Sequence, residues 1–228
     1  GTFTANAIEN TNAALIAEGY IAEADGDLFN IIYDPFYGYA KVNNVDELSA
    51  ALANGQSKIY LAAGEVFEGT FAPKVNTEFL SDSENKATIK GRVNTKSIDI
   101  SFENIKFACL AGHSDKAWEG VGATAKGNEA IVMIENAASS FENCNFEMDA
   151  TYVACAINNH NAAADSDKLT VNNCTFAGNM YAIKTRTHFN ITNSTFDIDG
   201  PNFTIYSVFT WGVDFPASAV FSNNRNLS

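Results

Sequence analysis

The fold is decided by Phe102-Glu103-Asn104-Ile105-Lys106-Phe107, a motif that recurs four more times, the last copy being incomplete. The further copies are FENCNF at 141–146, VNNCTF at 171–176, ITNSTF at 191–196 and FSNN at 221–224. Their central asparagines are 39, 30, 20 and 30 residues apart. A unit that recurs at this spacing is typical of a solenoid, in which each repeat buries its apolar face only by stacking on the next. Apolar and polar residues alternate within the motif, so the repeats are predicted to be strands.

Equivalent side chains of the repeats are predicted to lie directly above one another. The phenylalanines that end the motif should form an aromatic stack inside the fold. The asparagines should occupy turns with left-handed backbone and bond to one another through their amides. Cys144 and Cys174 share one place in the motif with Ile105 and Ser194. This place favours a buried stack of small side chains, although rungs about 4.8 Å apart also permit a disulfide.

Composition excludes several classes of function. The chain has 228 residues, of which 46% are hydrophobic and 18% charged, and its formal net charge is −13. Nucleic acid is excluded as a partner because phosphate binding needs a basic surface. An anionic polysaccharide would also be repelled unless calcium or a local basic patch intervened. The sequence has no apolar run long enough to span a membrane, and its four cysteines lack the spacing of a zinc site. Because the first residue is Gly1, we expect that an export signal has been removed.

The chain is predicted to have two parts. Residues 1–40 should form a small appendage, with a helix at 9–18 and a hairpin that turns at Asp25-Gly26. Residues 41–228 should form the solenoid. It begins with a helix capped by Asn44 and Glu47, whose apolar face would cover the first rung. Further strands are predicted at 58–62, 64–71, 87–91, 130–134, 153–157, 181–184 and 204–209.

The stretch from Val42 to Phe71 resembles the opening of right-handed parallel β-helix proteins of the pectin-lyase-like group. Ile59-Tyr60-Leu61-Ala62-Ala63-Gly64-Glu65-Val66-Phe67 matches the strand that follows the capping helix in that group, and Thr88-Ile89-Lys90-Gly91 is similar to the next one. The resemblance covers roughly residues 42–228. It implies a mainly β fold, a single-stranded right-handed parallel β-helix with an N-terminal capping helix and the helix-hairpin appendage.

The catalytic motifs of that group are not found in this sequence. Asp165 and Asp167 form a loop pair without the further aspartates of a calcium-dependent lyase. None of His113, His160 and His188 lies in a Gly-His-Gly. No Ser-His-Asp set and no glycine-rich phosphate loop can be assigned. The sequence therefore assigns no catalytic residue, no metal site and no cofactor, and enzyme activity stays undecided with a preference against it.

One set of polar residues is a candidate binding site. The candidates follow the second strand of successive repeats, and alignment on the next asparagine places them near one another on one outer face. They are Glu135, His160, Lys184, Arg186 and Trp211. Solenoid faces serve as extended binding surfaces, and an aromatic ring beside planar polar groups suits a sugar. The alternative is that these are ordinary solvated residues at the entrances of turns.

Three functions are compatible with these observations. The first is a non-catalytic exported or cell-surface module that binds a polysaccharide or host glycan along one face. The second is a polysaccharide lyase or glycoside hydrolase with a divergent site. The third is a structural or adhesive spacer that associates through the edge of its C-terminal coil.

Overall fold

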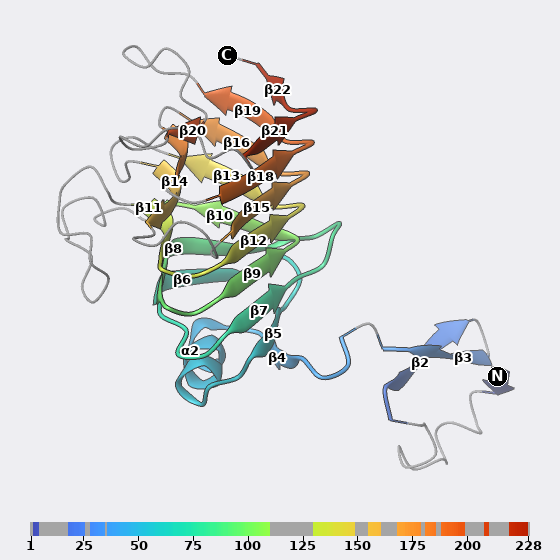
Figure 1. Ribbon diagram of the computed structural model, residues 1–228. Coiled ribbons are helices and arrows are strands. Elements are labelled where there is room, and N and C mark those ends of the chain that lie inside the picture. Colours follow the sequence, from blue (N-terminus) through green and yellow to red (C-terminus); the bar gives the residue numbers. More distant parts are fainter. Residues whose placement is uncertain are drawn as a thin grey trace. The chain divides into compact units, whose positions relative to one another are not determined.

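The computed structural model (Figure 1) describes residues 2–4, 18–25, 28–34, 36–109, 130–148, 155–160, 168–178, 181–185, 188–198, 208–209 and 219–227. The chain divides into two compact units, Gly1–Tyr39 and Ala40–Ser228. Among the described residues no helix is long and apolar enough to cross a membrane.

The first unit is a small antiparallel sheet with the strand order β1-β3-β2. Its strands are β1 (Thr2–Thr4), β2 (Tyr20–Asp25) and β3 (Leu28–Tyr33). The register pairs Asp25 with Leu28, so the predicted hairpin is confirmed. Strand β1 was not predicted from the sequence. The helix predicted at 9–18 lies almost wholly outside the described residues.

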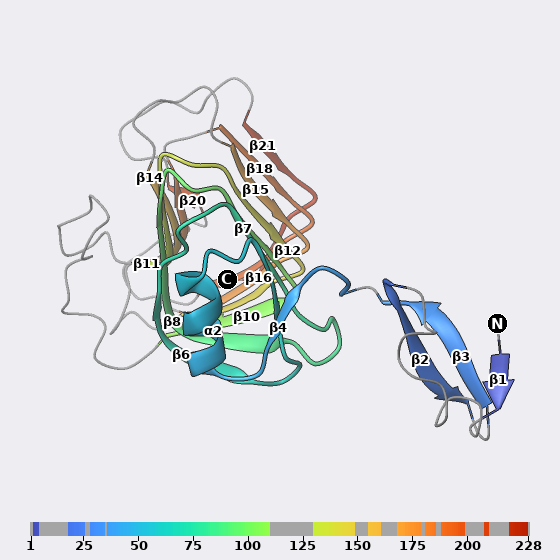
Figure 2. The same ribbon diagram turned by 90° about the horizontal axis from the view of Figure 1, so that it is seen from below.

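The second unit begins with strand β4 (Ala40–Val42) and helix α2 (Val45–Ala53), which starts after Asn44 as predicted from the sequence. The side chain of Asn44 accepts a hydrogen bond from the Glu47 backbone N–H at 2.9 Å. The Glu47 carboxylate in turn accepts from the Asn43 N–H at 2.7 Å, which lowers the pKa of Glu47. These bonds satisfy backbone donors that the first helical turn leaves open. The helix lies across the end of the sheets (Figure 2), and its buried residues are Leu48, Ala51 and Leu52.

Two parallel sheets make up the rest of the second unit. The short sheet has the order β21-β18-β15-β12-β9-β7-β5-β4. Its remaining strands are β5 (Lys58–Leu61), β7 (Thr77–Leu80), β9 (Ile100–Glu103), β12 (Ser139–Glu142), β15 (Lys168–Asn172), β18 (His188–Thr192) and β21 (Val220–Ser222).

The long sheet has two arms that meet at β8 (Ala87–Lys96), with β6 (Val66–Phe71) also paired to β8. One arm contains β10 (Ile105–Ala108), β13 (Asn145–Met148), β16 (Thr175–Gly178), β19 (Thr195–Ile198) and β22 (Arg225–Asn226). The other arm contains β11 (Ala130–Glu135), β14 (Cys155–His160), β17 (Tyr181–Thr185) and β20 (Val208–Phe209).

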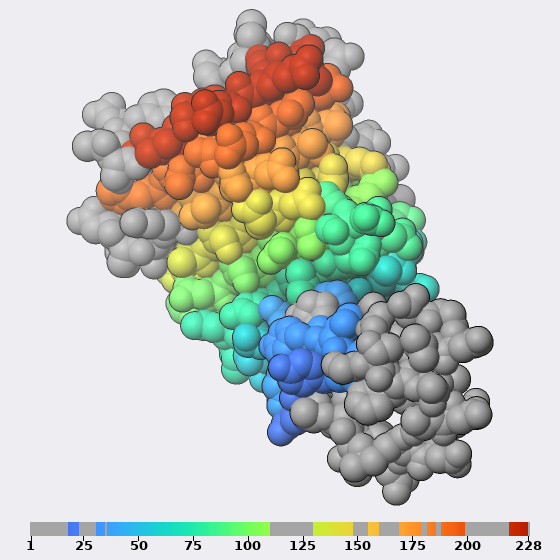
Figure 3. All heavy atoms as spheres, turned by 90° about the vertical axis from the view of Figure 1, so that its right-hand side faces the viewer, coloured from blue at the N-terminus to red at the C-terminus, as the bar shows by residue number. Residues whose placement is uncertain are grey.

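The chain visits the short sheet and the two arms in turn, so equivalent strands of successive turns stack as parallel neighbours. Figure 2 shows the short sheet and both arms surrounding the core. On the face in Figure 3, the turns follow one another as bands from green through yellow to red. Strand β8 joins the arms because residues 87–90 pair with β10 and residues 93–96 pair with β11. Gly91, at φ +141°, lies between these halves, and a Cβ there would approach the Gly69 carbonyl oxygen to 2.0 Å.

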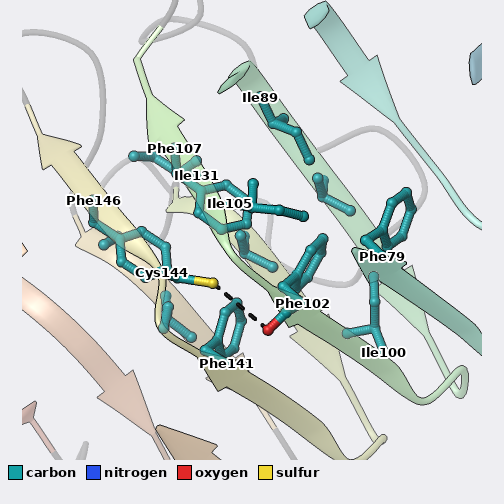
Figure 4. Close-up of a cluster of buried hydrophobic side chains, with 14 of the residues drawn as sticks. Phe79, Ile89, Ile100, Phe102, Ile105, Phe107, Ile131, Phe141, Cys144 and Phe146 are labelled. Carbon is teal, nitrogen blue, oxygen red and sulfur yellow. Dashed lines mark hydrogen bonds between the residues drawn. The ribbon is translucent and has the colours of Figure 1, made fainter. Parts of the chain in front are cut away.

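The predicted aromatic stack is present in the core. The ring centroids of Phe107 and Phe146 are 4.7 Å apart, those of Phe146 and Phe176 are also 4.7 Å apart, and Phe196 follows at 5.0 Å. All four rings are buried. A second stack, which the sequence analysis did not identify, joins Phe79, Phe102 and Phe141 at 5.0 and 5.3 Å (Figure 4). Each stacked pair contributes about 0.5–1.5 kcal/mol beyond the burial of its apolar area.

The motif asparagines have the predicted left-handed backbone, with φ between 50° and 59° at Asn104, Asn143, Asn173, Asn193 and Asn223. The Asn143 amide donates to Asn104 Oδ1 at 2.8 Å, and the Asn173 amide donates to Asn143 Oδ1 at 3.4 Å. The next rung differs, because the Asn193 amide donates to Asn172 Oδ1 at 2.7 Å instead. The predicted ladder is therefore confirmed over its first three rungs.

The cysteines of the motif form the predicted stack of small buried side chains. Cys144 and Cys174 are free thiols. The backbone N–H of Cys144 donates to Cys174 Sγ at 3.4 Å, and that of Cys174 donates to Ser194 Oγ at 3.1 Å. Each side chain thus satisfies a backbone donor of the preceding turn. Burial, together with the neighbouring Cys174, raises the pKa of the Cys144 thiol well above its usual value.

Candidate functional site

Three of the five candidate residues lie on neighbouring strands of the second arm. Glu135 pairs with Lys96 on one side and with His160 on the other. Lys184 pairs with Asn158, two residues before His160. The sequence alignment that placed Glu135 beside His160 therefore agrees with the backbone register. Two candidates, Arg186 and Trp211, lie outside the described residues, as do His113, Trp118, Asp165 and Asp167.

These strands direct alternate side chains to opposite faces of the sheet. Val132, Ile134 and Ile157 belong to the hydrophobic core, and the residues that alternate with them point to the other face, where Ile131, Met133 and Ala156 are also fully buried. The register forms two rows on that face. We call the following residues the polar strip: Asn94, Asn158 and Lys184 in one row, in which the buried Met133 lies between Asn94 and Asn158, and Lys96 and Glu135 in the other, with His160 next to Glu135 in the backbone register.

The polar strip is buried although it lies on the side of the sheet away from the core. Glu135 is 9% exposed and Lys184 is 8% exposed, and Asn94 and Asn158 are also buried. Charged side chains are rarely buried to this degree unless they are paired. Glu135 and Lys184 are therefore not ordinary solvated residues, which was the alternative left open by the sequence.

An ion pair holds the Glu135 carboxylate. Lys96 Nζ lies 2.8 Å from Glu135 Oε1, and the Lys96 side chain is half exposed. Because Glu135 is buried, loss of this cationic partner would weaken the compensation for the lost hydration of its carboxylate. The pair fixes the orientation of the carboxylate on the outer face.

Asn94 carries an unsatisfied acceptor. Its Oδ1 has no hydrogen-bond partner among the residues that the structure describes, and the residue is 7% exposed. A buried carbonyl without a donor costs about 1–3 kcal/mol. Such a group in a folded protein indicates strain, a bound water or a ligand contact. Met133 separates Asn94 from Asn158 and Lys184 in the row, so a ligand that donates to Asn94 Oδ1 and also contacts Asn158 would have to cross Met133.

Nucleophilic thiol chemistry is disfavoured at this site. Burial raises the pKa of the Cys155 thiol to about 12, although the nearby Lys184 acts in the opposite direction. The thiolate is the nucleophilic form, and it is scarce at neutral pH under these conditions. Within the described parts of the chain, no three His, Cys, Asp or Glu side chains are arranged to hold a metal ion.

Sequence reasoning missed Asn94 and Lys96, although a signal for Lys96 exists. Lys96 precedes Asn104 by eight residues, and Glu135 precedes Asn143 by the same number. The residues that follow, Ser97 and Asn136, share left-handed backbone at φ 56° and 53°. Extending the alignment one repeat toward the N-terminus would have included Lys96.

Comparison of the chain with protein families, with curated proteins and with solved structures finds no match.

Proposed function

We propose that residues 41–228 form a right-handed parallel β-helix of the pectin-lyase-like type, a non-catalytic exported or cell-surface module that binds a glycan on its polar strip. The single observation that carries the binding proposal is the burial of Glu135 and Lys184 on the outer face of the second arm. Apolar residues would be cheaper to bury at these positions.

The winding of the chain supports the proposed fold. From β9 to β20 each turn contributes one strand to the short sheet and one to each arm of the long sheet, and the strand pairs described in the second unit are parallel. Parallel strands of one sheet are nearly always joined by right-handed connections. Helix α2 covers one end, as expected for a stack that must protect its first rung.

The chemistry of the polar strip supports a glycan as ligand. Amide, carboxylate and ammonium groups in fixed positions hydrogen-bond well to sugar hydroxyls, and orientation is what gives such sites their specificity. The strip carries both signs of charge, and Lys96 and Glu135 already neutralise each other. Together with the net charge of −13, this favours a ligand that is neutral or weakly charged.

A glycan array followed by calorimetry with the best ligand tests this proposal. We expect Glu135→Gln and Lys184→Met to weaken binding at least tenfold, and Arg186→Ala and Trp211→Ala to weaken it if the predicted column extends to them. The control is Lys106→Ala, because Lys106 pairs with Glu147 on the other arm, away from the strip. No binding on the array, or binding that the strip variants leave unchanged, would refute the proposal.

The same ligands also test the alternatives kept from the sequence. Release of reducing ends or unsaturated products would show that the protein is a divergent hydrolase or lyase and not a non-catalytic module. Association through the C-terminal edge is the remaining alternative. Strand β21 lies at the edge of the short sheet, and Val220 and Phe221 are exposed there. Light scattering that finds a monomer at high concentration would exclude this mode.

A further inference from the structure

A second candidate site lies on the outer face of the short sheet, away from the polar strip. It is a hollow of about 550 Å³ that crosses strands β5, β7, β9, β12 and β15. Ligand pockets commonly have volumes of about 300–1,000 Å³. Short polar side chains provide most of its lining, and the only aliphatic side chains are those of Ile100 and Ala138 among the lining residues that the structure describes.

One row of outward side chains crosses the hollow. The register aligns Lys58, Glu78, Ser101, Ser140 and Thr170 on consecutive strands. Neighbouring strands are about 4.8 Å apart, so five of them span about 19 Å. The hollow therefore extends along the stack of turns and suits a linear ligand better than a compact one.

The hydroxyls in the middle of this row are available to a ligand. Ser101, Ser140 and Thr170 are half-buried, and in the described structure their hydroxyls hydrogen-bond to no other side chain. Each hydroxyl can both donate and accept a hydrogen bond. The row thus offers repeated, neutral hydrogen-bonding groups at the spacing of the strands.

Hydrogen bonds hold the rim of the hollow in place. The backbone N–H of Asp99 donates to Asn76 Oδ1 at 3.1 Å, and the N–H of Ala138 donates to Asp99 Oδ1 at 2.9 Å. At one end, Lys58 Nζ lies 3.4 Å from Glu78 Oε2. Glu78 and Asp99 give the lining two carboxylates against one ammonium group. This balance repels anionic ligands and favours partners rich in hydrogen-bond donors.

We propose that this hollow binds a neutral linear oligosaccharide, laid along the stack of turns. The alternating donors and acceptors of sugar hydroxyls match the serine and threonine row and the two carboxylates. A peptide is less suited, because the lining offers no deep apolar pocket for its side chains. The inference does not rest on the polar strip, and it holds even if that strip binds nothing.

The experiment titrates the full chain with neutral gluco-, manno- and xylo-oligosaccharides of increasing length and measures the dissociation constant by calorimetry. Ser101→Trp is expected to fill the hollow and to abolish measurable binding. The matched control is Glu103→Trp, which places the same ring on the same face of the same strand, outside the lining. This control should bind like the unchanged chain, and Ser101→Trp should leave binding to the polar strip intact.

A second variant guards against misfolding of Ser101→Trp. Ser140→Ala combined with Thr170→Val removes two hydroxyls with little change of volume and should weaken binding at least tenfold, with an unchanged thermal unfolding curve. Affinity should also increase with oligosaccharide length until the row is filled. The inference is overturned if no neutral oligosaccharide binds, if both tryptophan variants lose binding equally, or if a peptide or an anionic sugar binds the hollow instead.

Discussion

The asparagine corner of each turn and the polar strip differ in how their residues change from one turn to the next. In both, equivalent residues of successive turns lie next to one another. At the corner, Asn104, Asn143 and Asn173 repeat the same residue with the same left-handed backbone. Along the strip, Lys96 and Glu135 occupy equivalent places with opposite charges. Residues repeat where each turn meets the same environment above and below. Residues differ on the outer face, because stacking of the turns does not require them to be the same. Such positions are free to serve in binding.

The largest loss of stability is expected from a substitution in the core next to the asparagine corner. Phe146 is buried between Phe107 and Phe176, so Phe146→Ala removes two stacked contacts and leaves a cavity. We expect the free energy of unfolding to fall by about 3–5 kcal/mol, measured by urea titration. The control is Phe221→Ala on β21 of the short sheet, where the ring lies tilted 5.8 Å from Phe196 and is 51% exposed, so the loss should be far smaller. Equal losses would show that the stack does not stabilise the fold as described.

The asparagine corner itself should show the next largest effect. Asn143→Ala removes the hydrogen bond that the side chain donates to Asn104 Oδ1 and those that it accepts from Asn173 and Lys86, and it places alanine at φ 50°. Left-handed backbone costs about 1–2 kcal/mol in a residue such as alanine, which lacks the local hydrogen bonds of asparagine, and the lost hydrogen bonds add about 1 kcal/mol. We expect a loss of about 2–3 kcal/mol in urea titration.

A glycine variant separates these two contributions at the corner. Asn143→Gly loses the side-chain bonds but keeps the left-handed backbone without strain. It should therefore be more stable than Asn143→Ala. If the two variants are equally unstable, the backbone conformation is not what selects asparagine at this position.

The polar strip should respond to charge rather than to shape. Lys96→Met keeps the aliphatic stem but leaves the buried Glu135 carboxylate without its partner at 2.8 Å. We expect a loss of about 1–2 kcal/mol, at the low end for a buried pair because the Lys96 side chain is half exposed. Adding Glu135→Gln should recover most of that loss, as measured by a double-mutant cycle. A cycle with no coupling would contradict the ion pair.

The sequence predicted the corner well because its chemistry is local. The motif suffices to predict the turn, because asparagine readily adopts a left-handed backbone. The alternating apolar residues beside it suffice to predict the stack. Three strands, β1, β4 and β7, were not predicted; they are only three or four residues long and lie outside the repeated motif. The extension of β8 beyond Gly91 was also missed, because it depends on pairing with β11 thirty or more residues later.

The candidate sites were harder to predict for a different reason. Glu135 could be named from alignment, but its burial depends on the tertiary structure. The hydroxyls of Ser101, Ser140 and Thr170 are typical outward residues of a strand when each is considered alone. Only the register shows that they form one row, and only the structure shows that the row crosses a hollow.

The smallest effect on stability is expected at Asn94, where a substitution should change ligand affinity more than the free energy of unfolding. Asn94 Oδ1 is buried, and no described residue donates a hydrogen bond to it, so this group lowers the stability of the folded chain. Asn94→Ala removes this acceptor together with some side-chain packing. Because the two changes act in opposite directions, we expect the free energy of unfolding to stay level or to rise by up to about 1 kcal/mol. Affinity for a ligand of the polar strip should fall at the same time, since proteins retain such costly groups where activity needs them.

The matched variant is Asn158→Ala in the same row, which should lose stability because Asn158 already has an interaction partner. If Asn94→Ala instead destabilises the chain as much as Asn158→Ala does, then Asn94 serves packing, and the binding proposal rests on the burial of Glu135 and Lys184 alone.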